Sequence, residues 1–308
     1  MESIKVFSPA SVSNVGPGFD IMGFALHQPG DEVIVKKSNL NKIEITKISG
    51  DNGRLPLNPN ENTTTVGIQS LLKDQNINVG LKIEIHKKMG IGSGLGSSAA
   101  SAVAGVFAVN SLLNLNLSND ELLKHCMAGE YVASKAFHAD NVAPALYGGF
   151  ILIRDYNPID IIKIDLPSDL YCSILYPDIE IKTCEARKIL KPNVKLKTAI
   201  SQAGNSAGLI VGFMKNDFEL ISRSLVDHLA EPFRSKLIPG YDKIRDAALN
   251  VGAINCNITG SGPSMFAFST SESDALKIVR AMKNASSKFT KSNKTYVSKI
   301  NLTGPKIL

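Results

Sequence analysis

Apolar positions in the first half of the chain follow the two-residue period of strands and then the longer period of a helix. Short β-rich runs at residues 4–7, 32–37 and 43–48 precede a helical stretch at 62–73. In residues 81–87, Leu and Ile alternate with charged side chains. This alternation predicts a half-buried strand that runs into a glycine-rich loop.

The region after this loop predicts helices and one further strand. Residues 97–113 are rich in Ala, Val and Leu, which indicates a buried helix, and Ser118 with Glu121 forms a capping box that starts the next helix. A strand is expected at 149–154. Charged and proline-containing turns follow it, so we expect a domain boundary near residue 155, with domains at 1–155 and 156–308.

The second half alternates strands and helices again, which indicates an α+β fold of packed layers. Its expected strands are at 171–176, 253–259 and 265–269, and its expected helices at 183–190, 196–215, 241–250 and 273–282. A length of 308 residues suits two domains.

Composition and charge exclude several classes of protein. Net charge is +6, but the lysines are spread along the chain without interleaved aromatics or a nucleic-acid motif, so they indicate a solvated surface. The cysteines have neither disulfide-framework nor zinc-site spacing, and we interpret them as small core residues: Cys126, Cys172, Cys184 and Cys256. The start lacks a secretory signal and no run is apolar enough to span a membrane, so we expect a cytoplasmic protein.

The strongest chemical signal is the loop at residues 89–101, which reads MGIGSGLGSSAAS and directly precedes the expected buried helix. Glycines allow the backbone to approach a ligand closely, and a helix N-terminus attracts anions, so the pattern predicts a polyphosphate site. No lysine follows these glycines as a P-loop requires, and no register gives the dinucleotide pattern Gly-x-Gly-x-x-Gly. A glycine-rich hairpin without a ligand is the alternative.

Three segments resemble the motifs of the GHMP kinases. The loop sequence GSGLGSSA is similar to their ATP loop, although many members have proline where this chain has Gly90. Residues 8–20, SPASVSNVGPGFD, resemble the first motif in its homoserine kinase form, with Val15 in place of leucine. Residues 258–264, ITGSGPS, resemble the third motif. Together these motifs cover the whole length of the chain.

The resemblance implies the two-domain GHMP kinase fold, with an N-terminal domain like that of a ribosomal protein and a ferredoxin-like C-terminal domain. It also implies ATP between the domains, Mg²⁺, and a homodimer. The implied metal ligands are Ser98 and Glu130. The implied ATP-binding residues are Asn62, Ile91, Gly92, Ser93, Gly94, Leu95, Gly96, Ser97, Ser98, Ala99, Ala100 and Ser101.

Similarity to the homoserine kinase branch implies a small zwitterionic substrate, L-homoserine, on the pathway to threonine. The implied substrate-binding residues are Asn14, Asp20, His138, Asn141, Thr183, Arg187, Arg234 and Gly262. Guanidinium forks suit a carboxylate. The catalytic candidates are Asn141, Arg187 and Asp140, and we expect Asp140 not to act as a base.

Other functions remain open at this point. Another GHMP kinase, acting on mevalonate or shikimate, would share the ATP loop but not the arginine pair. A non-catalytic ligand sensor would not need Glu130 and Ser98. A nucleic-acid-binding protein would need a platform of aromatic and basic residues, which the sequence does not suggest.

Overall fold

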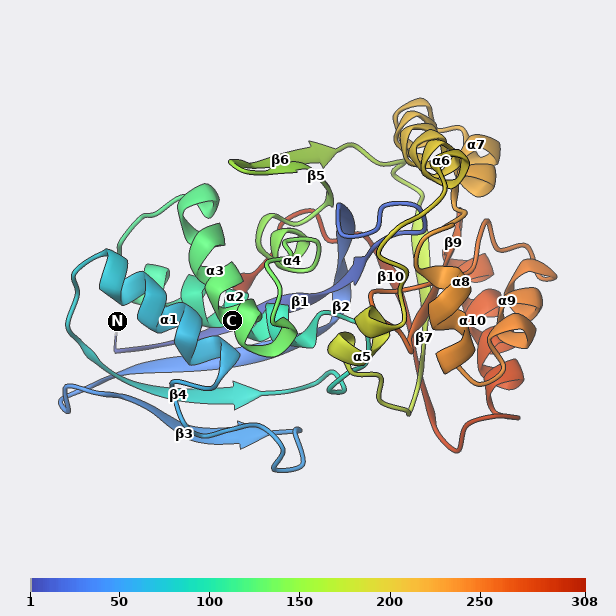
Figure 1. The fold of residues 1–308 in the computed structure, drawn as a ribbon. Helices are drawn as coiled ribbons and strands as arrows, with labels where there is room; N and C mark the ends of the chain where they lie inside the picture. Colours follow the sequence, from blue (N-terminus) through green and yellow to red (C-terminus); the bar gives the residue numbers. More distant parts are fainter. Residues whose placement is uncertain (1) are drawn as a thin grey trace.

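The computed structural model describes residues 2–308, and its first half is built on a seven-stranded sheet (Figure 1). Strands run in the order β11-β1-β2-β4-β3, and β5 extends from β2 and pairs with β6. The only parallel pair in this described sheet is β3 with β4. The strands are β1 (Ser3–Ser13), β2 (Met22–Ser38), β3 (Ile43–Ser49), β4 (Gly80–His86), β5 (Phe150–Tyr156), β6 (Ile159–Ile164) and β11 (Lys306–Ile307).

Helices cover one face of this sheet and enclose the first hydrophobic core. Apolar side chains of β4, such as Ile83 and Ile85, pack against α1 and α2 in that core. Asn62 starts α1 by accepting a hydrogen bond from Thr64 N, and Ser118 and Glu121 form the predicted capping box of α3. The helices are α1 (Thr63–Asp74), α2 (Ser97–Leu112), α3 (Asn119–Ser134) and α4 (Val142–Tyr147).

The second half forms an antiparallel four-stranded sheet with the order β10-β7-β9-β8. It comprises β7 (Tyr171–Pro177), β8 (Asn257–Ile258), β9 (Met265–Ser269) and β10 (Asn293–Lys299). Its helices are α5 (Thr183–Lys188), α6 (Leu196–Lys215), α7 (Phe218–Ser224), α8 (Glu231–Arg234), the 3₁₀ helix η1 (Ser235–Leu237), α9 (Tyr241–Leu249) and α10 (Glu272–Ser286). Side chains of α9 and α10 pack on this sheet in a separate core.

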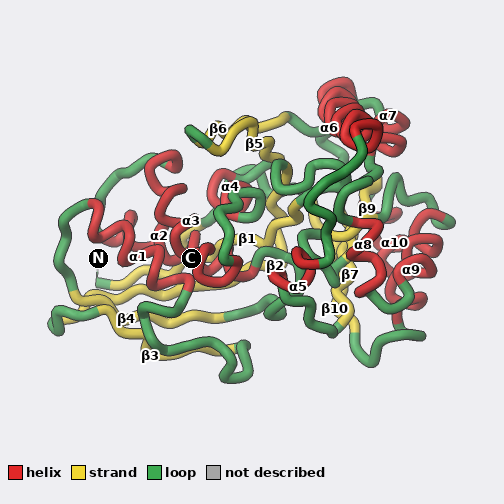
Figure 2. The backbone as a smooth tube through the Cα atoms, in the orientation of Figure 1, coloured by secondary structure: helices red, strands yellow, loops and turns green. Residues whose placement is uncertain are grey.

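A cluster of buried phenylalanines joins the two sheets. Phe24 on β2 contacts Phe150 on β5 and also Phe266 and Phe268 on β9, with ring centroids 5.3–6.2 Å apart. Phe213 of α6 packs against Phe150 and Phe268. Figure 2 shows loops gathered between the two halves.

The fold is the two-domain α+β fold that the sequence predicts, but several details differ. The expected strand at 253–259 is wrong in length because only Asn257–Ile258 is a strand. Phe268 N of β9 donates its hydrogen bond to the Asn255 side chain, Oδ1, and not to a backbone carbonyl of a neighbouring strand. Residue 155 lies in the β5–β6 hairpin of the first sheet, so a division of the chain there stays a prediction. No helix of residues 2–308 is long and apolar enough to cross a membrane.

Candidate active site

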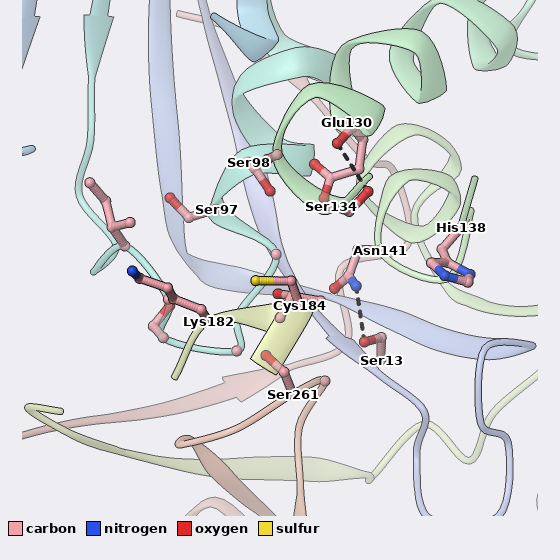
Figure 3. A pocket seen from close by; sticks show the side chains of 18 of the residues that line it. Ser13, Ser97, Ser98, Glu130, Ser134, His138, Asn141, Lys182, Cys184 and Ser261 are labelled. Atoms are coloured by element: carbon pink, nitrogen blue, oxygen red, sulfur yellow. Dashed lines mark hydrogen bonds between the residues drawn. The ribbon is translucent and has the colours of Figure 1, made fainter. Parts of the chain in front are cut away.

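A cavity of about 320 Å³ lies where the glycine loop, the first motif, α3 and α5 meet (Figure 3). Side chains from both halves line it, and the close-up shows Ser98 near Glu130, Ser97 farther from Glu130 than Ser98, and Ser13 and Asn141 on another side. The cavity therefore brings together residues that are far apart in the sequence.

The glycine loop has the backbone that a phosphate cradle requires. Gly92, Gly94 and Gly96 have φ values of 67°, 78° and 65°. Residues with a Cβ atom rarely adopt such values. Gly96 is the N-cap of α2, so the unpaired N–H groups at the start of this helix open into the cavity. The predicted loop residues that line the cavity are Ile91, Gly92, Ser93, Gly94, Gly96, Ser97 and Ser98.

The other predicted loop residues support the loop from behind. Leu95, Ala99 and Ala100 are buried in the hydrophobic cores. Ser101 is buried as well, where its hydroxyl donates to Asp31 Oδ2 at 3.2 Å. These four residues therefore shape the loop, and the structure places none of them in the described lining of the cavity.

A buried ion pair fixes both ends of the loop. Asp31 is fully buried and accepts hydrogen bonds from Lys88 N at 2.8 Å, from Ser97 Oγ at 2.8 Å and from the Lys87 ammonium group. Lys87 also donates to Ser97 O and Ser101 Oγ, both at 2.7 Å. Because these contacts use all three ammonium hydrogens, Lys87 holds the loop in place although it lines the cavity. Its position directly before the loop was the only sequence signal for it.

The first and third motifs are bonded to the loop. Ser11 N donates to Leu95 O at 3.1 Å, Thr259 Oγ1 donates to Gly94 O at 2.8 Å, and Ser264 N donates to Ser93 O at 3.2 Å. The three motifs therefore form one structural unit around the cavity.

Glu130 on α3 and Ser98 at the start of α2 present oxygen atoms side by side. Burial raises the pKa of Glu130 to about 7, although a hydrogen bond with Ser98 and the Lys87 charge partly oppose this shift. Glu130 Oε2 is buried and has no hydrogen-bond partner within residues 2–308. A carboxylate oxygen with a free lone pair next to a hydroxyl is a donor set that suits a hard divalent cation.

A cluster of charged side chains also lines the cavity. Arg187 Nη2 donates to both carboxylate oxygens of Asp20, at 2.8 and 2.9 Å. His138 Nδ1 lies 3.7 Å from Asp20 Oδ2, and burial lowers the pKa of His138. Arg234 is buried, and its Nη1 donates to Gly260 O at 2.9 Å. Together, these groups form a site with both signs of charge, as a zwitterion requires.

Asp140 and Asn141 line the same cavity. Asn141 accepts a hydrogen bond from Ser11 Oγ at 2.8 Å and donates one to Ser13 Oγ at 3.0 Å. Asp140 is buried, and burial together with the charge of Asp20 raises its pKa to about 7.

The remaining predicted site residues differ in their positions. Asn14 and Thr183 line the cavity. Asn62 and Gly262 are not in its described lining. Asn62 is buried as the cap of α1, and its neighbour Thr63 lines the cavity instead. Gly260 and Ser261 line it in place of Gly262. Cys184 is exposed and lines the cavity, so its assignment to the core was wrong. Lys182 and Glu180 also line it, and no sequence signal marked them.

Comparison with known proteins agrees with this geometry. The GHMP kinases N terminal domain matches residues 63–149, and the GHMP kinases C terminal domain matches residues 209–288. The homoserine kinase of Chlorobium phaeobacteroides strain BS1 is 45% identical over 295 residues, which cover 92% of each chain. The chain belongs to the homoserine kinases of the GHMP family.

This relationship extends to archaea and to solved structures. The homoserine kinase of Pyrococcus abyssi is 38% identical over 91% of each chain. The crystal structure of homoserine kinase from Cytophaga hutchinsonii superimposes with a TM-score of 0.97 at 48% identity, covering 100% of this chain and 98% of that one. A mevalonate kinase of L. major shares the fold alone, at 16% identity and a TM-score of 0.73. As a member of this family, the chain is a phosphotransferase.

Proposed function

We propose that this chain transfers the γ-phosphoryl group of ATP to the side-chain hydroxyl of L-homoserine. One observation carries the proposal: a glycine loop at a helix N-terminus shares a single cavity with two arginines and Asp20. The loop suits a polyphosphate, and the charged cluster suits an amino acid with a free carboxylate. An alcohol without charges, such as a sugar, would offer these arginines no carboxylate to bind.

Ser98 and Glu130 would hold Mg²⁺. Glu130 Oε2 has no hydrogen-bond partner among the described residues and lies close to the Ser98 hydroxyl. At phosphoryl-transfer sites Mg²⁺ usually takes one or two protein oxygens and completes its coordination with phosphate oxygens and water. When bound, the ion neutralises charge on the transferring phosphoryl group. Both residues lie on rigid helices, so their oxygens are positioned before any ligand arrives.

Asp20 and Asn14 suit the substrate ammonium group, and Arg187 and Arg234 suit its carboxylate. Asn141 is held by Ser11 and Ser13, so its amide has a fixed orientation and retains one N–H for the substrate hydroxyl. Thr183 and His138 line the same region. This arrangement would align the hydroxyl with the phosphates at the glycine loop.

Catalysis in this site depends mainly on proximity and on positive charge. The loop N–H groups and Arg187 stabilise the negative charge of the transition state. The hydroxyl proton leaves late, to phosphate or water, so a strong base is not required.

A coupled ADP-release assay tests the proposal. We expect turnover with MgATP and L-homoserine, and none with mevalonate, shikimate, galactose or threonine. Arg187→Ala should lower kcat/KM for homoserine by about a hundredfold, since it removes a charge-assisted contact to the substrate. Turnover of a different alcohol would reject the substrate assignment, and the absence of any turnover would favour a ligand sensor.

A further inference from the structure

Phe19 lies in a tight turn that the rest of the molecule holds firmly. Pro17 O accepts hydrogen bonds from two side chains of α6, Gln202 Nε2 at 2.8 Å and Ser206 Oγ at 3.0 Å. Gly18 O accepts the N–H groups of the two residues after Asp20, at 3.0 and 2.9 Å. The ring of Phe19 is therefore attached to a backbone with a defined position.

Both arginines of the cavity lie close to this one ring. The guanidinium carbon Cζ of Arg187 is 5.3 Å from the ring centroid, and that of Arg234 is 5.2 Å from it. Both distances are within the range of cation–π attraction. The two arginines line the cavity, whereas Phe19 is half-buried and outside the described lining. Phe19 therefore acts on the site through the arginines.

Two guanidinium groups that share one site repel each other. Asp20 is bonded to Arg187, while Arg234 has only carbonyl oxygens, Ala186 O at 3.3 Å and Gly260 O at 2.9 Å, as acceptors among the described residues. Arg234 is 3% exposed, so water screens its charge poorly. The negative face of an aromatic ring offsets part of this cost without competing for the N–H groups.

We propose that Phe19 is a positioning residue that holds Arg187 and Arg234 together as a clamp for the substrate carboxylate. This inference rests on the proposed function, because the clamp matters only if a carboxylate binds there. A residue that merely fills space could be replaced by leucine. A residue that acts through its π face could be replaced only by another aromatic residue.

The first test compares Phe19→Leu with Phe19→Tyr and Phe19→Trp. We expect Phe19→Leu to raise KM for homoserine about tenfold, with KM for ATP changed by less than about twofold. Either aromatic variant should restore most of the affinity. Phe7→Leu is the matched control, because Lys306 Nζ lies 5.4 Å from the centroid of the Phe7 ring, a similar contact outside the described lining of the cavity. This variant should leave both KM values unchanged.

A double-mutant cycle with Arg234→Ala provides the second test. If Phe19 acts through the arginines, Phe19→Leu should have less effect on kcat/KM in the Arg234→Ala background than in the parent. Fully additive losses, an equal loss in Phe19→Leu and Phe19→Tyr, or a rise in KM for ATP of the same size would each overturn the inference. Failure of the parent enzyme to phosphorylate homoserine would instead reject the proposed function.

Discussion

At the scale of single residues, Asp140 has the role that is hardest to infer from its residue type alone. It lies beside Asn141 in the cavity, and burial raises its pKa to about 7, a value that would suit a general base. The site, however, already offers positive charge from Arg187 and N–H groups at the loop, which can carry a reaction whose proton leaves late.

We therefore expect Asp140→Asn to lower kcat by less than about tenfold, with KM for homoserine little changed. Steady-state kinetics near pH 8 would measure this effect. A loss of about a thousandfold in kcat with KM unchanged would identify Asp140 as a true base and contradict this mechanism.

The same carboxyl group makes the stability of the protein depend on pH. Its pKa is about 7 in the folded protein and 3.8 as a free group. Between these two pH values, the folded form retains the proton that the unfolded form has lost. This contribution to stability is fully present below pH ~4 and is lost as pH rises to ~7. Without ligands, Asp140→Asn should be more stable than the parent by about 4 kcal/mol at pH 8, and nearly equally stable at pH 4. Urea unfolding at both pH values tests this, and equal stability at pH 8 would contradict it.

At the scale of elements, the glycine loop depends on close contact with the third motif. A Cβ atom on Gly94 would lie 2.6 Å from Thr259 O and 2.7 Å from Gly262 O, and its φ of 78° adds backbone strain. Gly94→Ala should therefore separate the loop from this motif and raise KM for ATP about tenfold or more.

Gly53→Ala is the matched control for this substitution. Gly53 has a similar φ of 69°, but a Cβ atom there would meet nothing within 4 Å. Both variants should lose about 1 kcal/mol of stability from backbone strain, and only Gly94→Ala should change KM for ATP. Equal effects of both variants on KM would show that strain alone explains the loss.

Elements with a strong periodic pattern could be predicted from the sequence, and others could not. The buried helix expected at 97–113 is α2, Ser97–Leu112, and the strand at 265–269 is β9. The strand β10, Asn293–Lys299, was missed because its sequence NKTYVSK is mostly polar and only half-buried, so no apolar alternation marks it. The hairpin strand β6 was missed because the proline-containing turn before it favoured a boundary.

The same limit applies to the site. Residues within the three motifs could be proposed from sequence, because their type and spacing resemble a known family. Glu180 and Lys182 enter the cavity from a loop after β7 that carries no motif. Asp31 reaches the loop from β2, and only the folded chain reveals that a carboxylate there bonds to both ends of the loop.

At the scale of the whole molecule, the cavity depends on how the two sheets are joined. Its glycine loop belongs to the first half, whereas Arg187, Arg234 and Ser261 belong to the second. Phe24 lies at the junction and packs against Phe150 in one sheet and Phe266 and Phe268 in the other. A loss of packing at this point should therefore disturb the relative position of phosphate loop and arginines as well as stability.

We expect Phe24→Ala to lower the free energy of unfolding by about 3–5 kcal/mol and to lower kcat/KM for homoserine at a temperature where the variant is fully folded. The matched control is Ile83→Ala, because Ile83 is equally buried but packs only between the first sheet and its helices. This control should lose about 2–5 kcal/mol of stability while keeping kcat/KM. Urea unfolding measures the free energy of unfolding. Steady-state kinetics measure kcat/KM at 15 °C, which is roughly 30 °C below the range where ordinary domains begin to unfold. A loss of kcat/KM in both variants, in proportion to their loss of stability, would contradict this prediction. Alignment of the two halves would then not depend on Phe24, and the junction would contribute only to the stability of the fold.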